Sequence, residues 1–153
     1  MFIVVAGEGG HFTQAKRLML SANFKSEFIL VTDNQNLSLE GASLSCCISP
    51  LRDKYKKDVL YSVKSFATNL RSINALFKEH KITRVISTGP GISIIVALIA
   101  KVYEVNVVHI ETWSRFKSKS FTGRIMYHLS DRFIVQHKCL LELYPRATYG
   151  GLL

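Results

Sequence analysis

The chain opens with MFIVVAGEGGHF (residues 1–12), an apolar run that reads directly into a cluster of glycines and a histidine. The apolar part, residues 2–6, predicts a buried β-strand, and the glycines predict a tight loop that leads to a helix near Thr13. A strand, a glycine loop and a helix in this order present free backbone N–H groups and the positive end of a helix dipole at one point. The stretch therefore predicts a site for an anion, most often a phosphate.

The composition is that of one folded domain spanning residues 1–153, with 48% hydrophobic residues and a mean hydropathy of +0.16. The formal net charge of +9 favours a polyanionic partner: nucleic acid, an anionic membrane surface or a phosphorylated substrate. Because a strand is predicted from residue 2 onward, we expect no signal peptide and no amino-terminal membrane anchor. The longest nearly uncharged apolar stretch, residues 92–100, is shorter than the ~20 residues that span a bilayer.

The cysteines do not form a disulfide framework. Their number is odd, and two of the three are adjacent: Cys46, Cys47 and Cys139. Reduced thiols in a cytosolic protein are the better interpretation. Since no Cys or His spacing matches a zinc site, no metal is expected.

Stretches typical of strands and of helices alternate along the chain. The predicted strands are residues 2–6, 27–32, 44–48, 84–87, 106–110 and 133–136. The predicted helices are residues 13–21, 54–80, 92–103, 118–129 and 138–144, and the apolar helix 92–103 is expected to be buried. This alternation predicts an α/β fold, a Rossmann-like and mostly parallel sheet with helices on both faces. Ligands of such sheets bind beyond the carboxyl ends of the strands, where three predicted loops meet: residues 7–12, 88–91 and 111–119.

The first loop matches neither of the common nucleotide-binding fingerprints. Phe12 stands where the dinucleotide motif requires its third glycine, and no Gly-Lys-Ser/Thr sequence follows. Gly9 and Gly10 could form a tight turn that packs the helix on the sheet, with His11 as a helix-capping residue. The place of His11, directly after a diglycine at a strand end, favours a functional role instead.

The second loop, STGPG at residues 87–91, again precedes a predicted helix. Backbone N–H groups at Gly91 and beyond could bind phosphate or contact a partner. Pro90 between two glycines could equally form a rigid turn without a ligand. The residues leave both interpretations open.

The third loop, HIETWSRFKSKS at residues 109–120, carries the most polar and aromatic chemistry. Glu111 follows an apolar strand, and two aromatic residues then stand among three cations: Trp113, Phe116, Arg115, Lys117 and Lys119. Such a mixture suits nucleic acid, and it equally suits a membrane interface with phospholipid-like headgroups. The alternative is a solvated loop in which Glu111 forms a salt bridge with a cation. Two further basic clusters lie at residues 52–57 and at Lys16 and Arg17.

A set of short motifs gives the chain a family resemblance. They are GGHFTQ (9–14), STGPG (87–91), ETWSR (111–115), SFTGR (120–124), DRFIVQH (131–137) and YPRATYGG (144–151). In this order and spacing they resemble the PssD/EpsE-type polysaccharide biosynthesis proteins. Those proteins are similar to the membrane-anchor subunit of the eukaryotic dolichol-linked N-acetylglucosamine transferase. We expect the chain to differ from the eukaryotic relatives in having no amino-terminal hydrophobic anchor. It departs from the family in having His137 where tryptophan is frequent.

The resemblance implies the fold of the amino-terminal half of a GT-B glycosyltransferase such as MurG, the half that receives a lipid-diphosphate-linked acceptor. We therefore expect an acceptor-binding, membrane-associated subunit of a two-component UDP-sugar glycosyltransferase in capsule or exopolysaccharide biosynthesis. Its partner would be a separate nucleotide-sugar-binding subunit (PssE-like), and the chain alone would have little or no activity. No cofactor is expected, because the partner would bind the UDP-sugar. The resemblance places the chain in the cytoplasm, peripherally on the anionic inner face of the cell membrane.

The same resemblance assigns the site residues. His11 and Glu111 are the candidates for the catalytic base, with Glu111 favoured as the base or its orienter and His11 near the acceptor phosphate or hydroxyl. The loop N–H groups would hold the acceptor diphosphate, assisted by Arg115. The expected acceptor- or phosphate-binding residues are Gly9, Gly10, Phe12, Thr13, Gly89, Gly91, Arg115 and Ser120.

Two alternatives remain on the sequence alone. The net charge motivates a non-enzymatic nucleotide- or nucleic-acid-binding α/β module. However, the cations gather at loops and at residues 52–57 rather than along a recognition helix, and no nucleic-acid-binding motif is present, so nucleic acid is not the expected partner. A scaffold that only recruits a catalytic partner to the membrane would tolerate the loss of His11 and Glu111.

Overall fold

A single parallel sheet organises the computed structural model, which describes residues 1–22, 24, 26–49 and 59–153. Within these residues the strand order is β3-β2-β1-β4-β5-β6-β7, and every neighbouring pair is parallel. The strands are β1 (Phe2–Val5), β2 (Phe28–Thr32), β3 (Ala42–Cys47), β4 (Arg84–Ser87), β5 (Asn106–Ile110), β6 (Arg132–Val135) and β7 (Thr148–Tyr149). The predicted Rossmann-like α/β fold is confirmed. The basic cluster at residues 52–57 lies outside the described residues.

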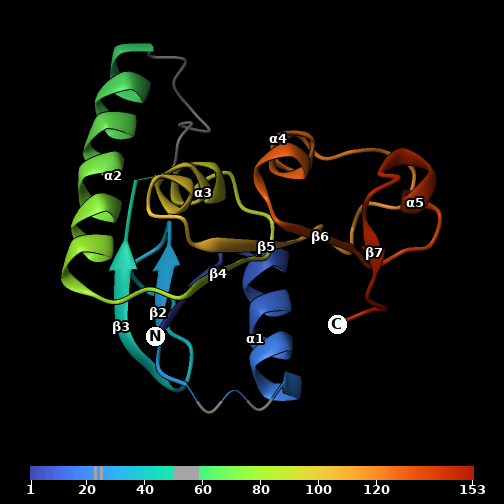
Figure 1. The fold of residues 1–153 in the computed structure, drawn as a ribbon, viewed down its shortest axis with the longest axis horizontal. Coiled ribbons are helices and arrows are strands. Elements are labelled where there is room, and N and C mark those ends of the chain that lie inside the picture. Colours follow the sequence, from blue (N-terminus) through green and yellow to red (C-terminus); the bar gives the residue numbers. More distant parts are fainter. Residues whose placement is uncertain (23, 25, 50–58) are drawn as a thin grey trace.

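Helices cover both faces of this sheet. They are α1 (Gly10–Ala22), α2 (Val59–Glu79), α3 (Ser93–Val102), α4 (Phe121–Leu129) and α5 (Leu140–Leu143). Figure 1 shows α1 on one side of the sheet, with α3 and α4 on the other. Two apolar clusters fill the layers: one contains Ala15 of α1, and the other contains Ile73 of α2, Ile95 of α3 and Met126 of α4.

The central strands are apolar because both of their faces are covered. All residues of β1 and β2 are buried. Parallel strands between two helix layers read as continuous apolar runs, which is why the sequence predicted these two strands correctly. The carboxyl ends of β1, β4 and β5 therefore lie side by side, and the three candidate loops follow them.

The first helix begins earlier than the sequence predicted, at Gly10 instead of near Thr13. Gly9 turns the chain with a φ of +71°, which L-residues rarely adopt, and its carbonyl accepts the Thr13 N–H at 3.1 Å. His11 and Phe12 are therefore in the first helical turn and not in a loop. Conversely, α4 begins at Phe121 instead of residue 118, because the Ser120 hydroxyl caps it by accepting the Gly123 N–H at 2.8 Å.

Two other predictions need correction. β7 was missing from the predicted strands; it has two residues and forms by pairing with β6. The apolar helix expected to be buried, α3, has an exposed side, with Leu98 at 38% and Val102 at 76% exposure. Its other face packs in the core through residues such as Ile95 and Ala100.

Three properties bear on localisation and chemistry. Among the described residues, no helix combines the length and apolarity needed to cross a bilayer. The same residues contain no group of three or more His, Cys, Asp or Glu side chains placed to hold a metal ion. Cys46, Cys47 and Cys139 carry free thiols.

Candidate functional site

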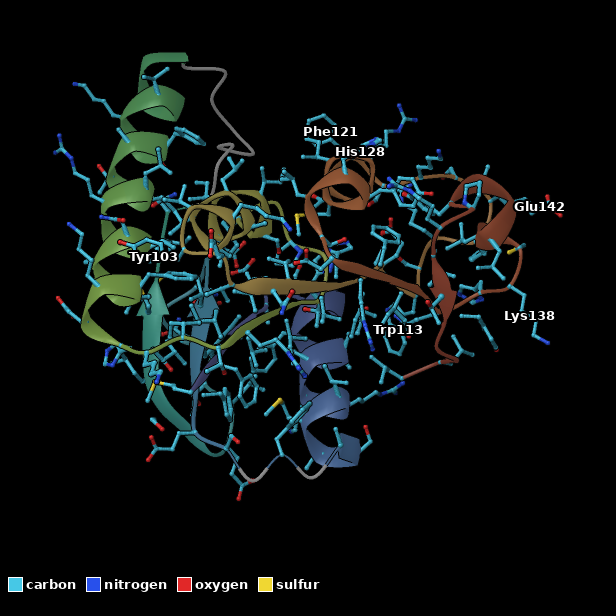
Figure 2. All side chains as sticks on the ribbon, in the orientation of Figure 1. Tyr103, Trp113, Phe121, His128, Lys138 and Glu142 are labelled. Carbon is cyan, nitrogen blue, oxygen red and sulfur yellow. The ribbon has the colours of Figure 1, made fainter. Side chains whose placement is uncertain are left out.

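The three loops predicted to meet do so at the amino-terminal end of α1. His11 Nδ1 lies 2.7 Å from the Thr88 carbonyl oxygen, which joins the first loop to the second. Gly10 and Trp113 lie close together, since a Cβ placed on Gly10 would be 3.3 Å from Trp113 Nε1. This approach joins the first loop to the third. The Arg17 guanidinium stacks over the Trp113 ring at 4.6 Å, and Figure 2 shows Trp113 close to α1. The candidate site is therefore a continuous surface formed by segments far apart in the sequence.

The contact with Thr88 fixes the tautomer of the neutral His11 ring. A backbone carbonyl only accepts hydrogen bonds, so Nδ1 must carry the proton and donate it. In the neutral imidazole the lone pair then lies on Nε2. The ring is half-buried, and among the described residues no hydrogen bond involves Nε2. His11 therefore has the geometry of an oriented general base with a free basic nitrogen.

Gly89 allows this arrangement. Its φ is +105°, and a Cβ at this position would approach the His11 ring to 2.9 Å. The Thr88 hydroxyl adds a second link between the loops, 2.9 Å from the His11 carbonyl oxygen. A residue with a side chain at position 89 would strain the backbone and displace the imidazole. Gly91 has no such neighbour, since a Cβ there would meet nothing within 4 Å.

Free amides surround the histidine. The N–H groups of Gly10, His11 and Phe12 have no acceptor among the described residues, as is usual in the first turn of a helix. They point toward the side from which the chain enters α1, where the helix dipole is positive. Thr13 differs, because its N–H and its hydroxyl are directed to the Gly9 carbonyl. The arrangement can bind a phosphate oxygen through backbone N–H groups.

Glu111 has a different environment from that expected of an exposed base. The residue is 0% exposed, and its carboxylate accepts hydrogen bonds from the Thr112 N–H at 3.0 Å, the Ser120 hydroxyl at 3.1 Å and the Tyr144 hydroxyl at 2.8 Å. Among the described residues it forms no ion pair, so the alternative of a surface salt bridge is wrong. In this conformation the carboxylate has no surface on which an acceptor hydroxyl could bind.

The pocket of Glu111 depends on a glycine and a tyrosine. A Cβ on Gly123 would overlap the Oε2 atom of Glu111 and would lie 2.7 Å from the Tyr144 hydroxyl oxygen. Burial, and then the charge of the Glu111 carboxylate, raise the pKa of Tyr144 above its usual range. The phenol therefore remains a hydrogen-bond donor at any physiological pH. The Ser120 hydroxyl, expected to bind phosphate, is already engaged with Glu111 and with the Gly123 N–H.

Two other expected phosphate ligands lie at the surface, Arg115 in the third loop and Phe12 in the first turn of α1. The Arg115 guanidinium is exposed, and within the part of the chain that the structure describes it donates only to the Ser118 hydroxyl, at 3.2 Å. Phe12 is half-buried and lines a cavity of about 320 Å³ together with Lys16 and Met19. Arg115 is therefore available to an anionic ligand, whereas Phe12 can offer its backbone N–H and an apolar wall.

The sequence analysis missed a buried polar group beneath the second loop. His109 is fully buried, its Nδ1 lies 3.0 Å from the Ser87 hydroxyl, and that hydroxyl donates to Ser93 at 2.6 Å and accepts the Gly89 N–H. Burial, with a smaller contribution from the nearby His11, lowers the pKa of His109 to about 3. The imidazole is therefore neutral and braces the loop that orients His11. The alternation Val107, His109, Glu111 could have indicated that these three side chains share one buried face.

Comparisons with known proteins identify relatives of this chain by sequence and by structure. The model of the family described as "Oligosaccharide biosynthesis protein Alg14 like" matches residues 2–153. The human UDP-N-acetylglucosamine transferase subunit ALG14 is 28% identical over 174 residues, covering 97% of this chain and 81% of the human protein. The subunit of the same name from Kluyveromyces lactis is 30% identical over 111 residues, covering 69% of this chain and 46% of the yeast protein.

Solved structures share the fold at low identity. MurG from Acinetobacter baumannii aligns with a TM-score of 0.63 and 14% identity, covering 88% of this chain and 40% of that one. The UDP-N-acetylglucosamine 2-epimerase from Rickettsia bellii aligns with a TM-score of 0.70 and 14% identity, covering 99% of this chain and 44% of that one. The chain thus spans less than half the length of either structure. The fold is that of one half of a MurG-like GT-B protein, and the chain belongs to the Alg14-like family of oligosaccharide biosynthesis proteins.

Proposed function

We propose that this chain is the acceptor-binding subunit of a two-chain UDP-N-acetylglucosamine transferase that acts on a lipid-diphosphate-linked saccharide. The observation that carries the proposal is His11, held by Thr88 with its Nε2 free, beside three free N–H groups at the start of α1. The relatives are named as UDP-N-acetylglucosamine transferase subunits, which supports this donor sugar. The capsule or exopolysaccharide context, the relation to PssD/EpsE-type proteins and the position on the inner face of the cell membrane belong to the same proposal.

The free amides would bind the acceptor. The diphosphate would accept hydrogen bonds from the N–H groups of Gly10, His11 and Phe12, with Arg115 supplying a positive charge from the third loop. The glycines at 9 and 10 keep side chains away from this end of the helix. The sugar next to the diphosphate would then lie close to the imidazole.

Of the two candidate bases, His11 is the one that the geometry favours. As the acceptor hydroxyl oxygen attacks the anomeric carbon of the donor, Nε2 of His11 would take the hydroxyl proton. The bond between that carbon and the diphosphate of UDP would break, and UDP would leave with the electron pair. Glu111 would have a structural role instead, because its buried carboxylate holds the start of α4 and the third loop together. Ser120 would share that structural role.

The donor would be bound by a second chain. The relatives are named as subunits of a UDP-N-acetylglucosamine transferase, which supports a separate nucleotide-sugar-binding partner, PssE-like in kind. In this arrangement residues 1–153 form one acceptor-binding domain that requires no cofactor of its own. The chain alone would transfer no sugar.

The test is reconstitution from purified chains. The chain is used as bait to recover its partner from native membranes, and the purified complex is assayed with a panel of UDP-sugars and a lipid-diphosphate-linked acceptor. We expect transfer from UDP-N-acetylglucosamine only when both chains are present. Recovery of nucleic acid in a salt-sensitive manner, with no glycosyltransferase partner, would instead support the nucleic-acid-binding alternative.

A further inference from the structure

Two phenylalanine side chains lie exposed near the candidate site. Phe116, in the third loop, is 53% exposed, and Phe121, the first residue of α4, is 77% exposed. Figure 2 shows Phe121 on the outer side of α4, directed away from the sheet. Leaving a phenylalanine ring in water forgoes most of the free energy that its burial provides. Such exposure on two nearby segments indicates a surface that is covered by something else.

The charge around these rings has one sign. Residues 112–130 contain four cations, Arg115, Lys117, Lys119 and Arg124, and no aspartate or glutamate. Among the described residues, none of the four cations forms an ion pair with a carboxylate. The Lys119 ammonium lies over the Tyr144 ring at 5.0 Å, while Lys117 and Arg124 extend from exposed positions. The surface is therefore complementary to an array of anions.

This surface lies at the same edge of the sheet as the candidate site. Because α4 returns the chain from the carboxyl end of β5 to the start of the parallel strand β6, its first residue stands at the carboxyl edge of the sheet. Ser120, directly before Phe121, donates to the buried Glu111 carboxylate at 3.1 Å. The position of Phe121 relative to the site is thus fixed by the core.

Phenyl rings between cations suit the interface of an anionic bilayer. The rings enter the boundary between headgroups and acyl chains, and the cations bind lipid phosphates, each contributing to affinity. A nucleic acid would instead require the rings to line a basic groove on which bases stack. Phe121 projects from the outer side of a helix and not into a groove (Figure 2).

We propose that Phe116, Lys117, Lys119, Phe121 and Arg124 form a membrane-binding edge that attaches the chain peripherally to an anionic phospholipid bilayer. The edge turns the amino-terminal end of α1, and with it His11, toward the membrane surface. A lipid-linked acceptor could then reach the site without leaving the bilayer. Only this last consequence rests on the proposed transferase activity; bilayer binding itself does not.

Vesicle flotation of the full chain tests the membrane-binding edge directly. We expect binding to vesicles of equal parts phosphatidylcholine and phosphatidylglycerol, and little binding to phosphatidylcholine alone. The variant K117E/R124E is expected to bind the anionic vesicles at least about tenfold more weakly. Phe121→Ser is expected to weaken binding by about tenfold as well, because one fewer ring is buried in the interface.

Matched variants control for charge and exposure. R71E/K78E makes the same change of charge on α2, and Val102→Ser removes an apolar side chain of equal exposure, 76%, at the far end of α3. Both are expected to bind vesicles like the wild type. Equal losses in the test and control variants would overturn the proposal, because they would show a general charge effect. Loss of oligonucleotide binding in K117E/R124E, with no vesicle binding by the wild type, would overturn it too.

A water-soluble acceptor separates this inference from the proposed function. In the reconstituted complex, K117E/R124E should transfer sugar to a short-chain acceptor at the wild-type rate and to a membrane-embedded acceptor more slowly. If the wild type binds anionic vesicles but transfers no sugar to either acceptor, the proposed function fails and the membrane-binding edge stands. If the complex transfers sugar but the chain does not bind the vesicles, the membrane-binding edge fails and the proposed function stands.

Discussion

The first and third loops place their ionisable side chains in opposite settings. His11 uses one nitrogen to hold its orientation and leaves the other free, next to unpaired backbone amides. Glu111 is fully buried, and three donors satisfy its carboxylate. Both residue types can act as a general base, so residue type alone does not separate them. Accessibility of the basic atom does, and it favours His11 as the base in the proposed reaction and a supporting role for Glu111.

The largest expected effect tests His11 as the base of the transfer reaction. In the reconstituted complex, His11→Ala should lower the rate of transfer by about 10²–10⁴-fold, because the acceptor hydroxyl loses its base. His11→Gln should be equally slow, since an amide can donate to Thr88 but cannot take the proton. His80→Ala, directly after the end of α2, is the matched control and should not change the rate of transfer. Unchanged turnover in His11→Ala would place the base elsewhere.

The next largest effect tests the packing of the pocket that holds Glu111. Gly123→Ala should lower the free energy of unfolding by about 2–4 kcal/mol, because its Cβ overlaps the Glu111 carboxylate and the pocket must rearrange. Denaturant titration measures this difference. Gly91→Ala, where an added Cβ meets nothing within 4 Å, should change stability by less than about 0.5 kcal/mol. A stable Gly123→Ala variant would show that the pocket is not tightly packed.

A smaller loss is expected when the carboxylate itself is changed. Glu111→Gln should lower the free energy of unfolding by about 1–3 kcal/mol, because the amide group cannot accept every hydrogen bond that the carboxylate accepts. Turnover per folded complex should change little, in contrast to His11→Ala. A variant of full stability that transfers sugar as slowly as His11→Ala would reverse the comparison and make Glu111 the base.

The smallest effect concerns His109, which braces the second loop. Burial lowers its pKa from 6.5 to about 3, so between these values the unfolded chain binds a proton that the folded chain does not. Stability therefore falls as the pH decreases below 6.5, by about 1.5 kcal/mol on reaching about pH 5. Denaturant titrations of the wild type and of His109→Gln should differ in this slope. Equal slopes would mean that His109 is not kept neutral by the fold.

Periodic apolar runs made most of the fold predictable. β4 and β5 have the predicted bounds, because each is a short apolar run flanked by polar residues or glycine. β7 was not predictable from two residues whose pairing with β6 is decided by the rest of the sheet. The start of α1 was misplaced because glycine and histidine have low helix propensity, yet the first turn is set by the bend at Gly9.

The meeting of the three loops was predictable, but the environment of each candidate residue was not. The convergence of three loops followed from the topology of a parallel sheet, and His11 followed from its position after the glycines. The burial of Glu111 did not follow, because it depends on Ser120 and Tyr144, which approach only in the folded chain. Distant hydrogen-bond partners leave little trace in a single sequence.

The overlap between Gly123 and Glu111 also restricts how the sequence can evolve. Position 123 can accept a side chain only if the residue at position 111 becomes shorter or leaves its pocket. Neither change alone is expected to be neutral, so the two positions should be inherited as a pair. Among relatives of this chain, a glutamate at the first position and a glycine at the second should be found together or lost together.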